Sequence, residues 1–396
     1  MKLSHVRLLA IGCSARAWHC SVPLPYSAVF SCGGGIRFSR RGNRFSTNMP
    51  RGRRRPTAVG KGFDTGLQHA APMLQDEVQN RGGEGNLKII YDEVFLKHRP
   101  PPGHPHPECP ARVSTARSEL DRMEGIEWVT PSSLRSEKGR ERTLAAMERV
   151  HNPEYLEEVR RVCAKGGGAA DFDTYICPDT FEVCIAASSA WMDAAESAAG
   201  GSPAFALARP PGHHATAGVG MGFCLVCFAV VAAFHALDAL GCSRVAMLDF
   251  DVHHGNGVAA LVKGDARIRY CSIHQGGIFP GSGGAEDSGP LGNLKHLPFF
   301  GVDEIWETYE PRFEEAVKWL EEFKPDLVLV SAGYDALHAD ELATASLQPE
   351  DYGRMGKRLK DVFGRKVAFG LEGGYNLQVT PVAIRATIEP FLCAGA

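Results

Sequence analysis

Two residues with metal-binding side chains, Asp251 and His253, stand two positions apart in the segment DFDVHHGNG (249–257). In extended chain, residues at this spacing project to the same side, so the pair can supply two ligands to a divalent metal ion. Asp335, in the segment SAGYDA, is the candidate third ligand from another strand end. Each Asp alone could equally cap a helix, but one imidazole and two carboxylates together suit a catalytic zinc site with a position open for water.

Adjacent histidines, His213 and His214, follow a Pro-Pro-Gly turn in the segment PPGHHATAG (210–218). Histidine titrates near neutral pH, so it can take a proton from a water molecule and return one to a leaving amine. Each ring needs a partner for its other nitrogen, and Asp249 and Asn256 flank the metal-binding segment. The histidine pair is therefore a candidate for acid-base work beside the metal.

Three aromatic residues follow glycines in other loops. Tyr375 comes after two glycines in LEGGYN (371–376), which allow the backbone to approach the site closely. Its hydroxyl can donate to the oxyanion that forms when an amide carbonyl is attacked. Phe223 of GMGFC and Phe279 of GGIFPGSG can form an apolar slot for a linear alkyl chain. Phe223 and Phe279 could equally be core residues, and Gly-Gly-Tyr taken alone is more often an ordinary turn with a packed aromatic.

Runs of nearly all apolar residues, separated by helical segments, must position these groups. Strands are expected at 87–92, 204–209, 244–251, 268–274, 326–335 and 366–374. Helices are expected at 111–124, 153–164, 180–199, 226–240, 303–323 and 349–363. This alternation predicts an α/β protein with three α/β/α layers and a mostly parallel sheet. Ligands gather at the carboxyl ends of such strands, and four of the polar motifs fall there.

The first 85 residues differ in composition from the rest of the chain. From Met1 to Phe63 there is no Asp or Glu, but there are ten Arg and two Lys. An Arg-rich, Ser-rich, acid-poor start is typical of a plastid or mitochondrial transit peptide. The alternatives are a basic arm that binds nucleic acid, or a nuclear-import patch at 51–56 in a nuclear or cytoplasmic protein. We expect a disordered presequence over 1–85 and one catalytic domain over 86–396.

The charge and apolar content of the remaining chain narrow the range of partners. Beyond Phe63 there are 31 basic and 46 acidic residues, a balance that argues against direct nucleic-acid binding and suits a cationic partner. No stretch approaches the roughly 18 to 20 consecutive apolar residues of a membrane-spanning helix, so we expect no membrane partner. The twelve cysteines are scattered, which favours reduced thiols, and Cys224 and Cys227 are expected in the core.

From about Ile89 to Pro390 the chain resembles the histone deacetylase family, in its class II and acetylpolyamine amidohydrolase-like branch. The segments that carry the resemblance stand in family order: HPHPECPARV, PPGHHA, GFC, DFDVHHGNG, SIHQGGIFPG, SAGYDA and EGGYN. The resemblance implies the arginase-like α/β/α fold of these deacetylases. It also implies hydrolysis of an N-acetyl group by attack of zinc-bound water.

The resemblance assigns roles to individual residues. It implies zinc ligation by Asp251, His253 and Asp335, acid-base work by His214 with His213 as electrostatic partner, orientation of these two by Asp249 and Asn256, and a transition-state hydroxyl on Tyr375. It implies an acyl-lysine tunnel walled by Phe223 and Phe279, with Gly222 and Leu342 as further substrate-binding residues. It also implies a structural potassium ion at Asp249, Asp251, His253 and Ser272.

One position bears on the substrate. Polyamine-selective members carry a Glu seven residues beyond the last zinc ligand, where this chain has Leu342, which favours acetyl-lysine in a protein or peptide. Glu341 is adjacent, so a shift of one residue in the loop would reverse this assignment. The alternatives are a deacetylase of acetylpolyamines or other small N-acetyl amines, and a catalytically inactive acyl-lysine-binding protein. The complete set of ligands, histidines and tyrosine speaks against the inactive protein.

Overall fold

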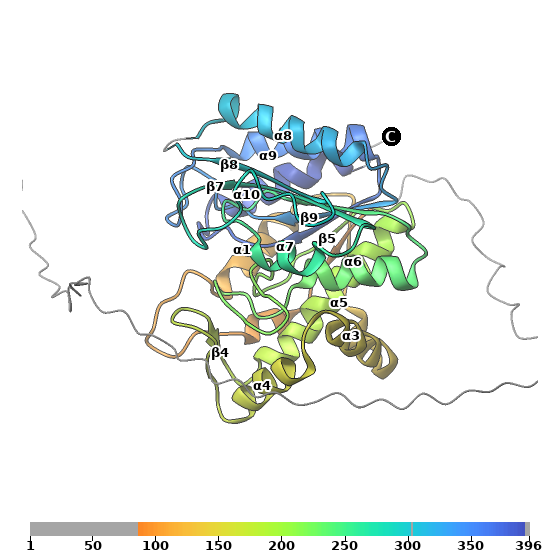
Figure 1. Ribbon diagram of the computed structural model, residues 1–396. Helices are drawn as coiled ribbons and strands as arrows, with labels where there is room; N and C mark the ends of the chain where they lie inside the picture. The colour runs from red at the N-terminus through yellow and green to blue at the C-terminus, as the bar shows by residue number, and fades with distance from the viewer. Residues whose placement is uncertain (1–85, 302–303, 393–396) are drawn as a thin grey trace, which may run out of the picture. The chain divides into compact units, whose positions relative to one another are not determined.

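The computed structural model describes residues 86–301 and 304–392 (Figure 1). The expected presequence, 1–85, lies outside the described residues. The strands are β1 (Leu87–Ile90), β2 (Ile126–Val129), β3 (Gly168–Ala169), β4 (Tyr175–Ile176), β5 (Ala204–Ala206), β6 (Val245–Asp249), β7 (Ile268–Gln275), β8 (Leu294–Phe299), β9 (Leu327–Ala332) and β10 (Val367–Leu371). The helices are α1 (Ala111–Leu120), α2 (Ser132–Arg135), α3 (Glu137–Val150), α4 (Pro153–Ala164), α5 (Thr180–Ala199), α6 (Phe228–Ala239), α7 (Asn256–Val262), α8 (Trp306–Glu321), α9 (Pro349–Phe363) and α10 (Thr380–Ile388), with 3-10 turns η1 (Glu93–Lys97) and η2 (Glu389–Phe391).

Eight strands form one sheet in the order β2-β1-β5-β10-β9-β6-β7-β8. Every neighbouring pair in this sheet is parallel. The strands that precede the four polar motifs, β5, β10, β9 and β6, are consecutive at its centre. Carboxyl ends of parallel strands share one edge of the sheet, so these four motifs meet there.

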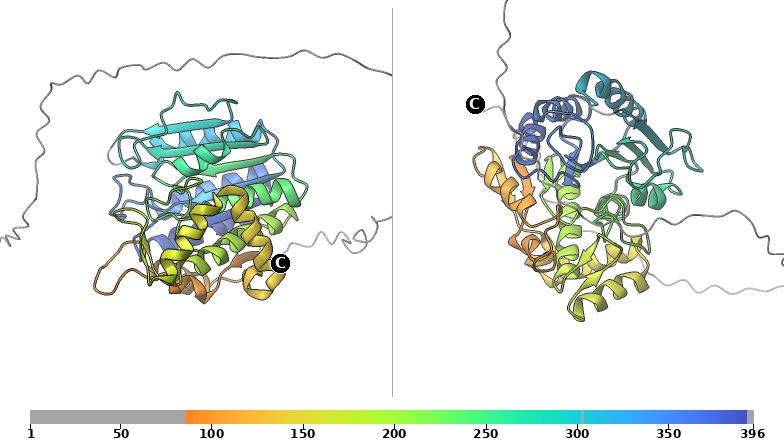
Figure 2. Two further views of the ribbon diagram at one scale, coloured as in Figure 1. Left: turned by 60° about the horizontal axis from the view of Figure 1, so that its bottom comes forward. Right: turned by 90° about the vertical axis from the view of Figure 1, so that its left-hand side faces the viewer.

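Helices cover both faces of the sheet. Helices α8 and α9 pack on one face, with α10 beside α9 and α1 beside α10, while α5 and α6 pack on the other (Figure 1). The two views of Figure 2 keep the cyan and blue α8–α10 on the opposite side of the sheet from the yellow-green α5. Because both faces are covered, every residue of β6, β9 and β10 is buried. The predicted three-layer α/β/α fold is confirmed.

The six expected strands and six expected helices are all present, and α4, α5 and α9 have the predicted bounds. Several elements were not predicted, among them β2, β8, α3, α7 and α10. The edge strand β2 has the sequence IEWV and is only half-buried, so it lacks the apolar run that marks a central strand. The strand expected over 244–251 was too long, because β6 ends at Asp249.

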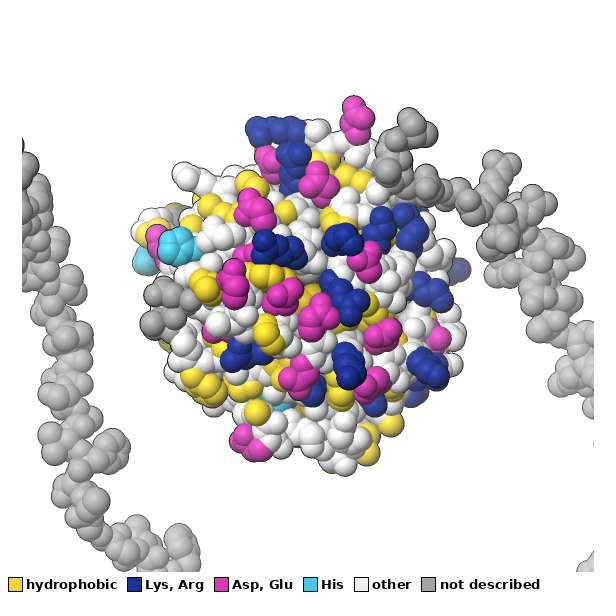
Figure 3. All heavy atoms as spheres, turned by 90° about the horizontal axis from the view of Figure 1, so that it is seen from above, with side chains coloured by type: hydrophobic (Ala, Val, Ile, Leu, Met, Phe, Trp, Pro, Cys, Tyr) yellow, Lys and Arg dark blue, Asp and Glu magenta, His cyan; other side chains and the backbone are white. Residues whose placement is uncertain are grey.

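Basic and acidic side chains are interspersed on the face above α8 and α9 (Figure 3). Ion pairs join them there, such as Arg358 Nε to Glu314 Oε1 at 2.9 Å and Lys357 Nζ to Asp361 Oδ2 at 2.6 Å. The acidic excess of the domain is therefore not gathered on this face. Within the described ranges, no helix has both the length and the hydropathy to cross a membrane.

Candidate active site

Asp251, His253 and Asp335 meet beyond the carboxyl ends of β6 and β9. One potential ligand atom from each lies within 4.8 Å of the others, and both carboxylates are fully buried. His253 Nδ1 faces both acids, 3.3 Å from Asp251 Oδ1 and 3.0 Å from Asp335 Oδ2. The structure thus brings together the three side chains that the sequence proposed as ligands.

The backbone that presents Asp251 and His253 is bent, so the extended conformation expected from their spacing was wrong. The chain leaves β6 at Asp249, and the His253 N–H donates to Asp251 Oδ1 at 2.9 Å across a turn. The N–H of Val252, between them, donates to Asp335 Oδ1 at 2.9 Å. The turn, rather than strand alternation, directs both ligands to one point.

The electrostatics of this group suit a bound cation. Burial and the nearby Asp251 carboxylate raise the pKa of Asp335 to about 7. Burial opposes a charge on His253, but its hydrogen bonds to Asp251 and Asp335 outweigh burial and raise its pKa to about 10. Two buried carboxylates this close favour a positive charge between them, and a metal ion supplies one.

Gly373 leaves room for the Asp251 and Asp335 carboxylates. A methyl group at this position would lie 2.2 Å from Asp335 Oδ2 and 2.6 Å from Asp251 Oδ2. Gly373→Ala is therefore expected to displace a ligand and weaken metal binding roughly 10- to 100-fold, the usual cost of disturbing groups that orient metal ligands. Metal content after dialysis measures the effect.

Gly264→Ala is the matched control, because a methyl group there meets no atom within 4 Å. Its metal content should equal that of the unaltered protein. A Gly373→Ala protein that retains its full metal content would contradict the placement of the metal between Asp251 and Asp335.

The two histidines follow β5, and each has the partner that the sequence proposed. His213 Nδ1 lies 3.1 Å from Asp249 Oδ2, and His214 Nδ1 lies 2.8 Å from Asn256 Oδ1. The ring centroids of the histidines are 4.0 Å apart. Asp249 is held in turn by the Tyr270 hydroxyl, which donates to its Oδ2 at 2.8 Å. Sequence reasoning missed Tyr270, which lies on β7 beside β6.

Different surroundings give the two histidines opposite proton affinities. Burial disfavours a charged His213, but the Asp251 and Asp249 carboxylates outweigh burial and hold its pKa well above the ordinary value. Burial and the neighbouring His213 and His253 hold the pKa of His214 well below the ordinary value. His213 can therefore carry a charge while His214 stays neutral and able to accept a proton.

Tyr375 follows β10 and is held from three sides. Its N–H donates to Asp340 Oδ2 at 2.6 Å, and its ring lies 4.6 Å below the Arg112 guanidinium and 5.6 Å from the Phe223 ring. Burial raises the pKa of its phenol well above the ordinary value despite Arg112, and the Asp335 and Asp251 carboxylates add to the increase. The hydroxyl therefore keeps its proton and can donate it.

The turn at Gly222 and Phe223 forms one border of the site. Both residues have positive φ, 55° and 69°, a conformation that a phenylalanine rarely adopts. Hydrogen bonds from the loop between β3 and β4 stabilise it, since Phe223 N donates to Thr174 Oγ1 at 2.9 Å and Gly222 N to Asp171 Oδ2 at 3.3 Å. This supporting loop carried no recognisable signal in the sequence.

Phe279 and Leu342 are exposed, 42% and 37% accessible, and the Leu342 N–H donates to Asp340 Oδ1, whose other oxygen accepts the Tyr375 N–H. The Phe279 ring centroid is 4.9 Å from that of His214 and 6.4 Å from that of His253. A methyl group on Gly222 would lie 2.7 Å from both His214 Cδ2 and Phe279 Cε1. Only a glycine leaves open the narrow space between the Phe279 wall and the histidines.

Glu372 is a buried residue of the site that sequence reasoning missed. Its carboxylate accepts the N–H groups of Gly212 and His213, at 2.6 and 3.1 Å, and the hydroxyl of Ser331 at 3.1 Å. Burial raises its pKa to about 7. Glu372, His213 and Cys224 are a second set of neighbouring side chains of the types that bind metal ions. The three hydrogen bonds of the Glu372 carboxylate indicate instead that Glu372 holds the turn of the two histidines.

Three further predicted positions lie close behind the site. Ser272 faces Asp249 across the β6–β7 pair and bonds His274 Nδ1 through its Oγ at 2.9 Å. Cys224 and Cys227 are free thiols with no solvent exposure, as expected for core residues.

Comparison with known proteins agrees with this arrangement. A family model described as "Histone deacetylase domain" matches residues 106–390. An uncharacterized protein of Synechocystis sp. is 42% identical over 312 residues, which cover 77% of this chain and 99% of that protein. Histone deacetylase 14, chloroplastic, of Arabidopsis thaliana is 35% identical over 301 residues, which cover 69% of this chain and 70% of that protein.

A solved structure shows the same fold. The crystal structure of the HDA15 HD domain matches with a TM-score of 0.71 at 30% sequence identity. The match covers 77% of this chain and 90% of that chain. With the family model spanning most of the described domain, the chain belongs to the histone deacetylase family of hydrolases.

Proposed function

We propose that the protein is a zinc-dependent amidohydrolase that removes acetyl groups from N-acetyl-lysine side chains of proteins. The observation that carries the proposal is the meeting of Asp251, His253 and Asp335 beside two histidines of opposite proton affinity. A donor set of one imidazole and two carboxylates fits zinc with open positions. When bound, zinc would polarise the acetyl carbonyl and lower the pKa of a water molecule.

The side chains around these ligands fit amide hydrolysis. Neutral His214, with Asn256 accepting from its Nδ1–H, can take the proton of the attacking water at Nε2 and deliver it to the leaving amine. His213, whose Nδ1 is bound to Asp249, serves as the electrostatic partner of His214. Tyr375 donates its hydroxyl proton in a hydrogen bond to the oxyanion.

An apolar approach to this centre supports a lysine side chain as the substrate group. Phe223 and Phe279 border the site from separate loops, and Gly222 keeps the space beside Phe279 open. Apolar walls favour the four methylene groups of an acyl-lysine, whose polar amide then reaches the metal ligands.

An assay that compares an acetyl-lysine peptide with an acetylated polyamine, with and without a chelator, tests the proposal. We expect faster turnover of the peptide, loss of activity with chelator and recovery on adding zinc. Activity that survives chelation would contradict a metal-dependent reaction. Faster turnover of the polyamine would instead favour the alternative function, deacetylation of small N-acetyl amines.

Replacement of Leu342 by glutamate should shift the preference toward acetylated polyamines. A carboxylate at the rim attracts the second cationic amine of a polyamine, and a surface pair of opposite charges is worth up to about 1 kcal/mol, or roughly fivefold in relative kcat/KM. Leu377→Glu is the control, since Leu377 has the same 37% exposure and follows Tyr375 by two residues. If Glu341→Gln rather than Leu342→Glu alters the ratio, Glu341 is the specificity residue.

A plastid is the location we propose for the protein. The acid-free, Arg-rich start of the chain supports organelle import, and a chloroplastic histone deacetylase of Arabidopsis thaliana is among its relatives.

We also propose a structural potassium ion near Asp249, Asp251, His253 and Ser272, supported by the burial of Asp249 and Ser272 side by side on β6 and β7.

A further inference from the structure

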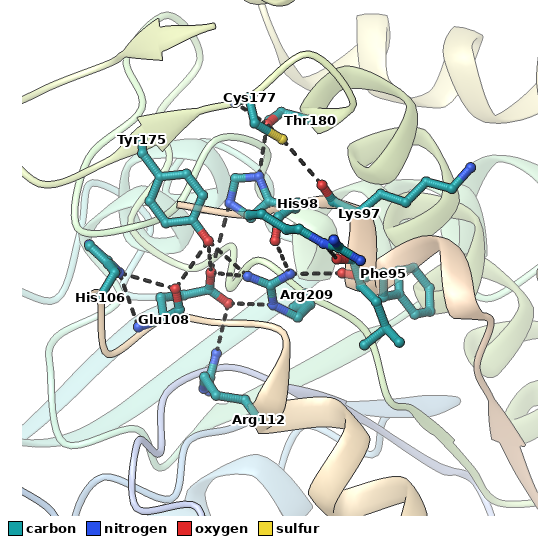
Figure 4. Close-up of polar contacts among 12 residues, drawn as sticks. Phe95, Lys97, His98, His106, Glu108, Arg112, Tyr175, Cys177, Thr180 and Arg209 are labelled. Carbon is teal, nitrogen blue, oxygen red and sulfur yellow. Dashed lines mark hydrogen bonds and ion pairs between the residues drawn. The ribbon is translucent and has the colours of Figure 1, made fainter. Parts of the chain in front are cut away.

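Glu108 is a fully buried carboxylate outside the group of metal ligands and histidines. It precedes α1 and has no solvent exposure, yet two arginines and a tyrosine hydroxyl converge on it (Figure 4). Burial alone would raise its pKa, but the charges of Arg209, His98 and Arg112 outweigh burial and lower its pKa to about 2. Glu108 is therefore a permanent negative charge inside the protein, and its partners lead directly to the catalytic segments.

The first partner, Arg209, leads to the histidines. Its Nε and Nη2 donate to the two carboxylate oxygens of Glu108, at 2.9 and 2.5 Å, as a bidentate pair (Figure 4). Its Nη1 donates to the carbonyl of Phe95 at 2.8 Å. Arg209 stands immediately before the Pro-Pro-Gly turn that presents His213 and His214, so the planar contact with Glu108 sets where that turn begins.

The second partner, Arg112, leads to the tyrosine. Its Nη1 lies 3.4 Å from Glu108 Oε1, and its Nε donates to the carbonyl of Gly374 at 2.8 Å. Its Nη2 donates to the carbonyl of Glu372, and its guanidinium covers the Tyr375 ring. Arg112 therefore contacts the turn that presents the Tyr375 hydroxyl at three residues, Glu372, Gly374 and Tyr375.

Glu372 closes the connection between the two turns. Its carbonyl accepts from Arg112, while its carboxylate accepts the N–H groups of Gly212 and His213. A continuous ring of contacts thus runs from Glu108 through Arg209 to the histidine turn, then through Glu372 and Arg112 back to Glu108. Its two glutamates and two arginines are all at most 2% exposed, so no water competes for these contacts.

We propose that Glu108 is a positioning residue that holds the His213–His214 turn and the Tyr375 turn in one fixed arrangement, through Arg209 and Arg112. The proposal rests on the proposed function, in which His214 and Tyr375 act in the same reaction. His214 and Tyr375 lie 161 residues apart in sequence, and the contacts of Glu108 join the two turns that carry them. An error of about 1 Å in such an arrangement can cost about 100-fold in rate.

A double-mutant cycle on the full-length, metal-loaded protein tests the role of Glu108. Turnover and KM for an acetyl-lysine peptide are measured for Glu108→Gln, Tyr375→Phe and the protein carrying both changes. Glu108→Gln keeps the volume of the side chain but removes its charge, and should lower kcat about 10- to 100-fold with KM within about threefold. In the Tyr375→Phe background, Glu108→Gln should lower kcat by a factor at least about fivefold smaller, because the tyrosine hydroxyl that Glu108 positions is already absent.

The size of that coupling separates positioning from mere support of the fold. If Glu108→Gln only destabilises the fold, it lowers kcat by the same factor whether residue 375 is Tyr or Phe. Equal factors in the two backgrounds would therefore overturn the proposal. Tyr375→Phe with near-normal turnover would overturn the role given to Tyr375 in the proposed function, and this inference with it. Slow Tyr375→Phe with equal factors in the two backgrounds would overturn only the role of Glu108.

Two further variants keep the test decisive. Glu108→Asp retains the charge but withdraws the carboxylate by one methylene group, and it replaces Glu108→Gln in the cycle if that protein does not fold. Asp193→Asn is the matched control, because it also disrupts a buried carboxylate, bound to Arg142 and Ser132, but on α5. Asp193→Asn should lower the melting temperature and leave kcat within about twofold in both backgrounds.

Discussion

Replacement of Tyr375 by phenylalanine is expected to lower turnover of an acetyl-lysine peptide by about two to three orders of magnitude, the usual cost of losing one oxyanion donor. The ring would stay in place, since its contacts with Arg112 and Phe223 do not involve the hydroxyl. The proposed metal ligands lie on other segments, so metal content should not change. Steady-state kinetics together with metal analysis measure both results.

Tyr309→Phe serves as the control for this experiment. Tyr309 is a buried tyrosine of α8 whose hydroxyl has no hydrogen-bond partner among the described residues. Removal of that hydroxyl should leave turnover unchanged. A Tyr375→Phe protein with near-normal turnover would show that another group stabilises the oxyanion.

Replacement of Asp251 by alanine is expected to abolish metal binding and activity together. Asp251 contacts His253 Nδ1, accepts the N–H of Gly373 at 2.7 Å and lies 3.7 Å from His213 Nε2. Its loss removes one of the three proposed ligands and the carboxylate that raises the pKa of His213. We expect metal affinity to fall at least about 100-fold, more than for a change in an orienting group.

Metal content after dialysis and activity with added zinc measure this effect. Asp351→Ala is the control, since Asp351 is also a buried aspartate but caps the start of α9. It should retain its metal and lose only stability, by about 1 kcal/mol. Retention of stoichiometric metal by Asp251→Ala would move the metal site to other residues, such as the group of His213, Cys224 and Glu372.

The sequence predicted the central elements well because buried strands consist almost entirely of apolar residues, which are recognisable in the sequence. Strands β6, β9 and β10 are covered on both faces, and their short apolar runs favour buried strands. Helix α5 is predicted to the residue, since a Thr near a Pro-Asp turn begins it and a Gly ends it. The edge strands β2 and β8 were missed because partial exposure allows polar residues to interrupt the apolar pattern.

The sequence also determined which residues are available for chemistry. The ligands, histidines and tyrosine follow strands whose parallel order places their carboxyl ends at one edge, so their meeting was predictable from topology. The partners of the histidines, Asp249 and Asn256, were likewise identified from residues that flank the ligands.

Only the tertiary structure decided how these residues are held and charged. The bend that aims Asp251 and His253, the opposite proton affinities of His213 and His214, and the buried ring around Glu108 all depend on groups far apart in sequence. A pKa or a hydrogen bond is set by which charges and dipoles surround a side chain after burial. The position of a residue just after a strand predicts that it lies at the edge of the sheet. The neighbours that determine its protonation state and its orientation come together only when the chain folds.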